Sequence, residues 1–214
     1  NIRNVHMMRL AGDSTLKRMR KLPTTKQIHC YANRDWLPII NQTYHTQLDW
    51  GELFNELFKP SPYLEQCLKE KRVSLPSIYI AVAFRMQNLL GDYPEYQYTS
   101  ASPNRQKEIL DACKTYILHL QKRTQKNILI TSDSERLTKE FENLTGIYIN
   151  TGSAAHVDTN SNAPLEQYCK SFIDFYLLSE AEEIYSVGTK EMYDSDFPRY
   201  AAKLNNRPFE RIVL

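Results

Sequence analysis

The fold is decided by an apolar, β-branched run that ends abruptly in an arginine and two amides, Ser77-Ile78-Tyr79-Ile80-Ala81-Val82-Ala83-Phe84-Arg85-Met86-Gln87-Asn88. The apolar part is long enough for a strand buried on both faces, and strands of that type belong to parallel sheets. Open sheets of this kind bind ligands at the carboxyl ends of their strands. Arg85 is therefore expected to contact a ligand, and its fork of N–H donors suits a phosphate better than a lysine does. A structural ion pair is the alternative for this arginine.

A regular alternation of helices and strands follows this first strand, which spans residues 77–85. Helical spacing and apolar runs predict the helices 104–125, 134–144, 164–180 and 197–204 and the strands 127–132, 146–150, 184–188 and 209–213. Such an alternation predicts a doubly wound, mostly parallel α/β sheet with right-handed crossovers. We expect this Rossmann-like domain to cover residues 75–214, after a partial, mainly helical region over residues 1–74 that includes a short strand at 27–32.

The composition is that of a soluble globular domain. Hydrophobic residues make up 42% and charged residues 24% of the chain of 214, which is enough apolar material for a sizeable core. The net charge of +2, without a long block of like charge, argues against a dedicated nucleic-acid binder. No apolar run reaches the roughly 18 residues of a membrane span, so only peripheral association with a membrane is left open.

The cysteines indicate the compartment. Cys30, Cys67, Cys113 and Cys169 are scattered and form no C-x-x-C pair, which argues against a zinc site or a disulfide framework. Free thiols in a reducing compartment, together with the absence of a visible signal peptide, predict a cytoplasmic protein. The chain opens on Asn1 in a polar segment, and we expect it to begin inside a longer protein.

Polar residues follow three of the predicted strands, and the ends of parallel strands meet at one edge of a sheet. The candidate ligand-binding residues are Arg85, Gln87 and Asn88 after the first strand, Thr131, Ser132 and Asp133 after the second, and Ser186, Gly188, Thr189 and Lys190 after the fourth. This set offers cations, hydroxyl and backbone donors and one carboxylate, which together suit a nucleotide diphosphate. We expect Arg85 and the turn 186–189 to hold phosphates, the turn partly through amides at a helix start. Asp133 is expected to accept hydrogen bonds from a base or a ribose.

Other patterns in the chain have simpler explanations. Ser132 and Glu135 have capping-box spacing, so the start of a helix is the alternative role for Asp133. Asp194-Ser195-Asp196 has the D-x-D spacing of metal-dependent sugar transferases, but its place before a helix predicts a cap rather than a metal site. His156 lies in a loop and is expected at the surface. The sequence has neither G-x-G-x-x-G after the first strand nor G-x-x-x-x-G-K-[ST], which argues against an NAD-type site and excludes a P-loop.

Three motifs carry a family resemblance. Ile80-Ala81-Val82-Ala83-Phe84-Arg85 is similar to a strand that ends in His-x-Arg, and Ile128-Leu129-Ile130-Thr131-Ser132-Asp133-Ser134 is similar to a strand that ends in Thr-Asp-Asp or Ser-Asp. The helical segment 172–181 has an Asp-x-x-x-Leu-Ser-x-Ala pattern, and the strand and Ser/Thr turn of residues 184–189 follow it. In order and approximate spacing, residues 77–205 resemble the fucosyltransferase superfamily. That superfamily includes the nodulation fucosyltransferase, the core α1,6-fucosyltransferase and the protein O-fucosyltransferases.

The resemblance implies a GT-B-type, metal-independent, inverting glycosyltransferase that uses GDP-fucose and needs no further cofactor. Residues 75–214 would form its C-terminal, donor-nucleotide half, and residues 1–74 a part of the acceptor-side domain. The resemblance also implies that Arg85 binds the β-phosphate and stabilises the GDP leaving group, that Asp133 recognises guanine, and that residues 186–189 line the diphosphate. The implied partners are a GDP-sugar donor and a glycan acceptor, in a bacterial cytoplasmic enzyme that builds a surface polysaccharide.

The chain departs from the family pattern at Ala83, where the family has the histidine of His-x-Arg. A non-catalytic nucleotide- or carbohydrate-binding module descended from such an enzyme is therefore the alternative function. An unrelated doubly wound domain with a structural Arg85 is a third interpretation. Asp92 and Glu95, in the loop after the first strand, are candidates for the base that activates an acceptor hydroxyl.

Overall fold

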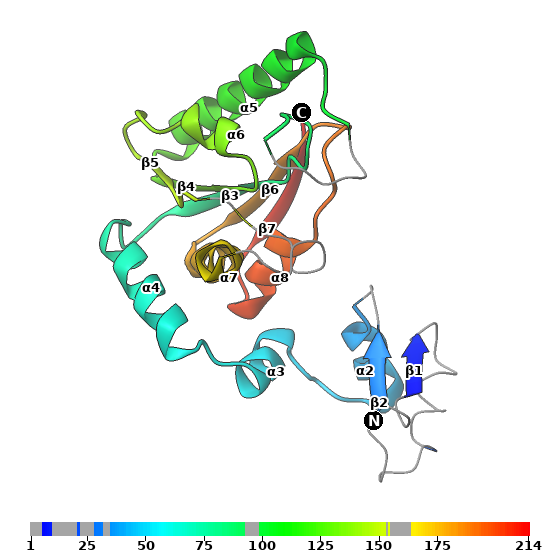
Figure 1. The fold of residues 1–214 in the computed structure, drawn as a ribbon. Coiled ribbons are helices and arrows are strands. Elements are labelled where there is room, and N and C mark those ends of the chain that lie inside the picture. Colours follow the sequence, from blue (N-terminus) through cyan, green and yellow to red (C-terminus); the bar gives the residue numbers. More distant parts are fainter. Residues whose placement is uncertain are drawn as a thin grey trace. The chain divides into compact units, whose positions relative to one another are not determined.

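The computed structural model describes most of the chain and divides it into two compact units. The described residues are 6–9, 21, 28–31, 35–92, 99–152, 154 and 164–214. Residues 1–53 form the first unit and residues 54–214 the second (Figure 1). All of the candidate binding residues belong to the second unit.

The first unit contains a small parallel sheet and a helix. β1 (His6–Arg9) and β2 (Ile28–Tyr31) pair in parallel, with His6 opposite Ile28. α2 (Leu37–Tyr44) has a proline in its first turn and ends at His45, which has a left-handed φ of 54°. The sequence pattern predicts a short strand at β2 but neither β1 nor α2.

The second unit is built on a five-stranded sheet in which all neighbouring strands are parallel. Its strands are β3 (Ile80–Phe84), β4 (Ile128–Ser132), β5 (Ile147–Ile149), β6 (Ile184–Gly188) and β7 (Phe209–Val213). Their spatial order is β5-β4-β3-β6-β7. From β3 the chain moves outward to β4 and β5, and then crosses back to β6 and β7 on the other side of β3. This doubly wound α/β architecture confirms the predicted fold class and makes the boundary of β3 and β6 the point where the strand order reverses.

Helices cover both faces of this sheet (Figure 1). One face carries α5 (Pro103–Thr124) and α6 (Glu135–Lys139), and the other carries α4 (Pro62–Val73), α7 (Leu165–Glu180) and α8 (Phe197–Leu204). Among the described helices, none is both long and apolar enough to cross a membrane.

The central strand β3 packs against helices on both faces of the sheet. Its alternate residues Ile80, Val82 and Phe84 pack in the core with α5. Ala81 and Ala83 face the opposite way and pack in the core with α7, where their small side chains let the helix approach the sheet closely. All five residues of β3 are buried. Burial on both faces explains why the sequence shows a continuous apolar run here rather than alternation.

Helix α4 belongs to the second unit, although the boundary expected from the sequence falls after it. Its first turn is capped by Ser61, whose Oγ accepts a hydrogen bond from the amide N of Leu64 at 3.2 Å. Leu68, at its centre, is fully buried in the core with α7. Phe54 of α3 (Trp50–Leu57) also contacts aromatic residues of α7. The compact unit that holds the sheet therefore begins at Phe54.

Candidate functional site

The carboxyl ends of β3, β4 and β6 lie beside one another at one edge of the sheet. Ser132 of β4 lies opposite Phe84 of β3, and Ser186 of β6 lies opposite Ala83. The polar groups that follow these three strands therefore start from neighbouring positions. The edge includes the boundary of β3 and β6, where sheets of this order bind their ligands.

Arg85 and Asp133, which follow β3 and β4, form an ion pair. Nη1 of Arg85 donates a hydrogen bond to Oδ2 of Asp133 at 2.5 Å. The arginine side chain is 22% exposed and the aspartate side chain 5%, so a ligand can reach the pair from the arginine side. A charge-assisted hydrogen bond in such a sheltered place is stronger than an exposed ion pair. The two residues expected to contact a ligand separately are thus also partners of each other.

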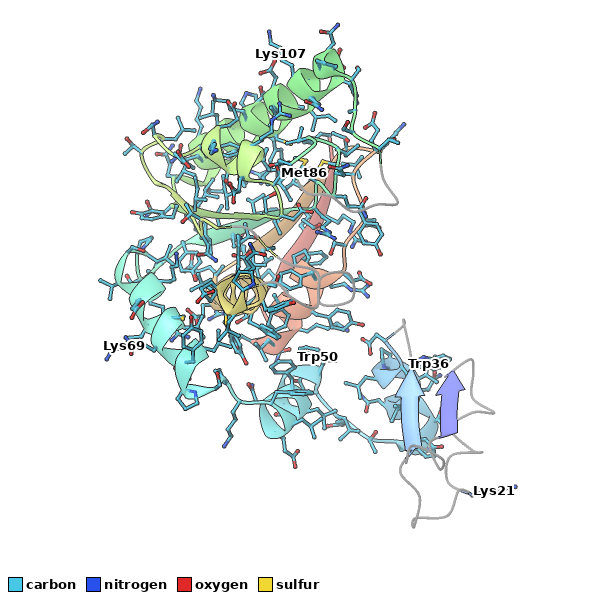
Figure 2. The ribbon with its side chains drawn as sticks, in the orientation of Figure 1. Lys21, Trp36, Trp50, Lys69, Met86 and Lys107 are labelled. Atoms are coloured by element: carbon cyan, nitrogen blue, oxygen red, sulfur yellow. The ribbon has the colours of Figure 1, made fainter. Side chains whose placement is uncertain are left out.

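The Asp133 carboxylate also holds the turn that follows β3. Its Oδ1 accepts a hydrogen bond from the amide N of Met86 at 2.7 Å, and its Oδ2 accepts one from the amide N of Gln87 at 2.8 Å. Met86, labelled in Figure 2, is fully buried. Gln87 is also buried and has a left-handed φ of 50°. Burial raises the pKa of Asp133, and the Arg85 guanidinium and the two amides act against that rise.

Two other candidates, Ser132 and Asn88, take part in local structure. The buried Ser132 hydroxyl oxygen accepts a hydrogen bond from the amide N of Ser134 at 3.1 Å. The carbonyl O of Asn88 accepts one from the amide N of Gly91 at 3.0 Å. The N-cap of α6 is Ser134, whose Oγ accepts from the amide N of Leu137 at 3.1 Å. The segment 132–135 is therefore a helix start, which the capping-box spacing left open, but the capping residue is Ser134 rather than Ser132.

The turn after β6 is packed around Met192. The amide N of Thr189 donates a hydrogen bond to Sδ of Met192 at 3.3 Å. The hydroxyl of Thr189 donates to the carboxylate of Glu191 at 2.7 Å. A Cβ on Gly188 would approach the Cβ of Met192 to 3.4 Å. Helix α8 begins only at Phe197, so the turn 186–189 does not open a helix. The expectation that this turn offers amides at a helix start is corrected accordingly.

A second ion pair, more deeply buried than the first, lies beside the end of β5. Nζ of Lys170 and Oδ2 of Asp174 are 2.7 Å apart on α7, and both side chains are less than a tenth exposed. Asn150, which follows β5, donates from Nδ2 to Oδ1 of Asp174 at 2.7 Å. Burial raises the pKa of Asp174, and the Lys170 ammonium and the Asn150 amide oppose the rise. Oδ1 of Asn150 is buried without a hydrogen-bond partner in the described part of the chain.

Neither Lys170 nor Asn150 is among the residues that the sequence nominates, and Asp174 enters only as a member of a motif. The sequence does hold a signal for the pair. Lys170 and Asp174 have i,i+4 spacing on a helix face whose other members, such as Ile173 and Leu177, are apolar and buried. Charged residues at that spacing on a core face are expected to pair, because an unpaired buried charge is unfavourable.

The acidic residues of the D-x-D segment are bound to arginine. Oδ1 of Asp194 lies 2.7 Å from Nε of Arg211, and Oδ1 of Asp196 lies 3.3 Å from Nη2 of the same arginine. Asp196 occupies the N-cap position of α8, but its side chain makes no capping hydrogen bond. The carboxylate of Asp196 binds Arg199 and Arg211 instead. The segment does lie at the helix start as expected, but the side chain that accepts a hydrogen bond from the amide N of Phe197 is that of Ser195, at 3.2 Å. In the described ranges, no three His, Cys, Asp or Glu side chains are placed to hold a metal ion.

Asp92, one of two candidates for a base, stabilises the start of α6. Its Oδ2 accepts hydrogen bonds from Oγ of Ser134 and from the amide N of Arg136, each at 2.8 Å. The other candidate, Glu95, lies outside the described residues, as does His156.

The edge of the sheet thus presents an arginine with a partly exposed side chain, whose guanidinium is hydrogen-bonded to a buried carboxylate. Such a group can bind an anion that approaches from the solvent side. The chain matches no protein-family model and no curated protein sequence. The functional assignment therefore depends on the residues and the geometry of this edge.

Proposed function

We propose that the chain carries the donor-binding domain of a glycosyltransferase that takes its sugar from a GDP-sugar such as GDP-fucose. The observation that carries the proposal is the place of Arg85, whose side chain is partly exposed directly after the central strand, where the strand order reverses. Sheets of this order bind nucleotides at that point, and the N–H fork of an arginine matches phosphate oxygens. The three motifs similar to the fucosyltransferase superfamily favour a sugar nucleotide over other phosphorylated ligands.

In the proposed reaction, an acceptor hydroxyl attacks the anomeric carbon of the donor sugar and gives up its proton to a general base, a carboxylate or water. The bond from that carbon to the β-phosphate oxygen breaks on the opposite face, so the configuration inverts and GDP leaves. Negative charge grows on the diphosphate as the bond breaks, and Arg85 stabilises that charge more strongly in the transition state than in the ground state. The positive charge comes from the guanidinium, so the scheme needs no metal. Gln87, Asn88 and the turn 186–189 are the further proposed contacts to the donor.

The proposal extends to the whole protein. It makes this sheet the C-terminal half of a GT-B enzyme and assigns acceptor binding mainly to the other half. It also includes a glycan acceptor, a cytoplasmic location and a role in building a surface polysaccharide. These points follow from the family resemblance.

A non-catalytic module is the second candidate function. Its support is Ala83, which is buried under α7 where the family's histidine would stand, so no imidazole lies beside Arg85 at that position. Such a module would still bind a nucleotide or a glycan. Only an enzyme would release GDP from a GDP-sugar faster when an acceptor glycan is added.

A thermal-shift titration tests the donor site. The purified protein is heated with GDP, GDP-fucose, UDP or ADP in the presence of EDTA. A ligand that binds only the native state stabilises it by about 2.7 kcal/mol at 100 times its Kd, which raises the Tm. We expect GDP and GDP-fucose to raise the Tm more than UDP or ADP. Equal Tm values with all four nucleotides and with buffer alone would contradict the proposal.

A further inference from the structure

We propose that Asp133 is a positioning residue that fixes the guanidinium of Arg85, rather than a residue that recognises the base of the nucleotide. This inference rests on the proposed function, because the guanidinium matters only if a phosphate binds there. It replaces the expectation that the Asp133 carboxylate contacts guanine.

The hydrogen bonds of the carboxylate carry the argument. Oδ2 accepts from Nη1 of Arg85 at 2.5 Å and from the amide N of Gln87 at 2.8 Å. Oδ1 accepts from the amide N of Met86 at 2.7 Å and from Oγ of Ser132 at 3.4 Å. An ionised carboxylate offers about four lone-pair sites, so three short hydrogen bonds and a longer one from Ser132 leave little room for a further donor. A nucleobase N–H would have to displace one of these donors to reach the carboxylate.

The burial of the two side chains also supports a positioning role for Asp133. The Asp133 side chain is 5% exposed and that of Arg85 is 22% exposed. The arginine is therefore the member of the pair that an incoming ligand meets first. A flexible arginine would lose conformational freedom on binding, whereas one already held by a carboxylate loses less.

The same carboxylate fixes the chain directly after Arg85. Its hydrogen bonds to the amides of Met86 and Gln87 tie the turn after β3 to the end of β4. Gln87 has a φ of 50°, which is unfavourable for a residue with a side chain and persists only where other contacts hold it. Asp133 thus sets both the backbone from which Arg85 extends and the direction of its guanidinium.

Binding of three nucleotides distinguishes the positioning role from base recognition. We would measure the Kd of GDP, UDP and ADP by calorimetry for the wild type, Asp133→Asn, Arg85→Ala and the double variant. The positioning role predicts that Asp133→Asn weakens all three nucleotides by the same factor, about tenfold, and keeps their order of preference. It also predicts that Asp133→Asn adds little in the Arg85→Ala background. Glu180→Gln is the matched control, because it alters the carboxylate that pairs with Arg72 at the C-terminal end of α7. This variant should bind the three nucleotides like the wild type.

Other outcomes overturn the inference. A selective loss of GDP affinity would assign Asp133 to the base and leave the proposed function intact. A uniform gain in affinity would show that removing a negative charge outweighs positioning. If the wild type binds none of the three nucleotides, the proposed function fails.

A measurement without a ligand tests the positioning alone. Nitrogen-15 NMR reports whether rotation of the Arg85 guanidinium is hindered, as a bond from Nη1 to a carboxylate requires. We expect hindered rotation in the wild type and faster rotation in Asp133→Asn. Free rotation in the wild type, or unchanged rotation in the variant, overturns the inference. If Asp133→Asn does not fold, Asp133→Glu takes its place, because it keeps the charge and moves the carboxylate.

Discussion

Two ion pairs lie near the carboxyl edge of the sheet, and they differ in how much water reaches them. Arg85 is 22% exposed beside Asp133, whereas Lys170 and Asp174 are both nearly inaccessible. A cation that must meet a ligand needs a path to solvent, and of these two cations Arg85 has one while Lys170 does not. The Lys170 pair instead joins α7 to β5 through Asn150, and we assign it a structural role.

The buried pair leads to a stability prediction. Lys170→Met removes the ammonium and leaves the Asp174 carboxylate buried, with the Asn150 amide as its remaining side-chain partner among the described residues. We expect the free energy of unfolding to fall by about 3 kcal/mol at neutral pH, measured by urea denaturation. The free energy of unfolding of the control, Lys170→Met/Asp174→Asn, should fall by less, because no buried charge is left unpaired.

The pH dependence of that variant has a definite sign. Without Lys170, burial raises the pKa of Asp174 in the folded state above its value in the unfolded chain. The folded state of the variant then binds the proton more tightly than the unfolded state. The loss of unfolding free energy relative to the wild type should therefore become smaller as the pH falls from about 7 towards about 5. A deficit that is the same at both pH values, or larger at the lower one, would contradict this account.

At the level of single residues, the sequence identified Arg85 and Asp133 but not their contact. An apolar run that ends in an arginine indicates a strand end, and this needs only neighbouring residues. The pairing of Arg85 with Asp133 depends on the parallel alignment of β3 and β4, and nothing local to either residue reveals it. The same holds for Asn150 and Asp174, which belong to a strand end and a helix.

At the level of elements, the predicted bounds are correct for three elements in which a glycine or proline marks the start or end of the helix or strand. β6, β7 and α8 have the predicted bounds, and residues such as Gly188, Pro198 and Pro208 mark their ends and starts. Helix α6 is shorter than predicted and ends at Lys139. The chain beyond it continues in tight turns, with the amide N of Phe141 bonded to the carbonyl O of Thr138 at 3.0 Å. Such turns keep apolar residues at nearly helical spacing, so the sequence pattern does not distinguish them from a longer helix.

Helix α4 provides a test of the unit boundary. Leu68 is fully buried against the sheet layer, whereas Val73 on the same helix is 84% exposed. We expect Leu68→Ala to lower the free energy of unfolding of the sheet unit by about 2–5 kcal/mol, through lost burial and a cavity. Val73→Ala, the matched control, should change it by less than about 0.5 kcal/mol. Equal effects of the two substitutions in chemical denaturation would show that α4 does not stabilise the sheet.

At the level of the whole molecule, the order of the strands matters more than any single motif. Three crossovers place β3 and β6 side by side, although about 100 residues of sequence separate them. This arrangement brings Arg85, Asp133 and the turn after β6 to one edge. The sequence predicts that convergence because parallel strands leave few alternatives, but it contains no residue that can be tied to the sugar or to the acceptor.

The most direct test of the central claim is the affinity for GDP of the wild type, Arg85→Ala and Arg72→Ala, measured by calorimetry without added metal. Arg72 is the matched control, because its guanidinium pairs with Glu180 at the opposite end of α7. The account predicts that Arg85→Ala weakens GDP binding at least about tenfold, whereas Arg72→Ala binds GDP like the wild type. Equal affinities of the two variants, or no binding by the wild type, would contradict the claim that this edge of the sheet is a nucleotide-diphosphate site.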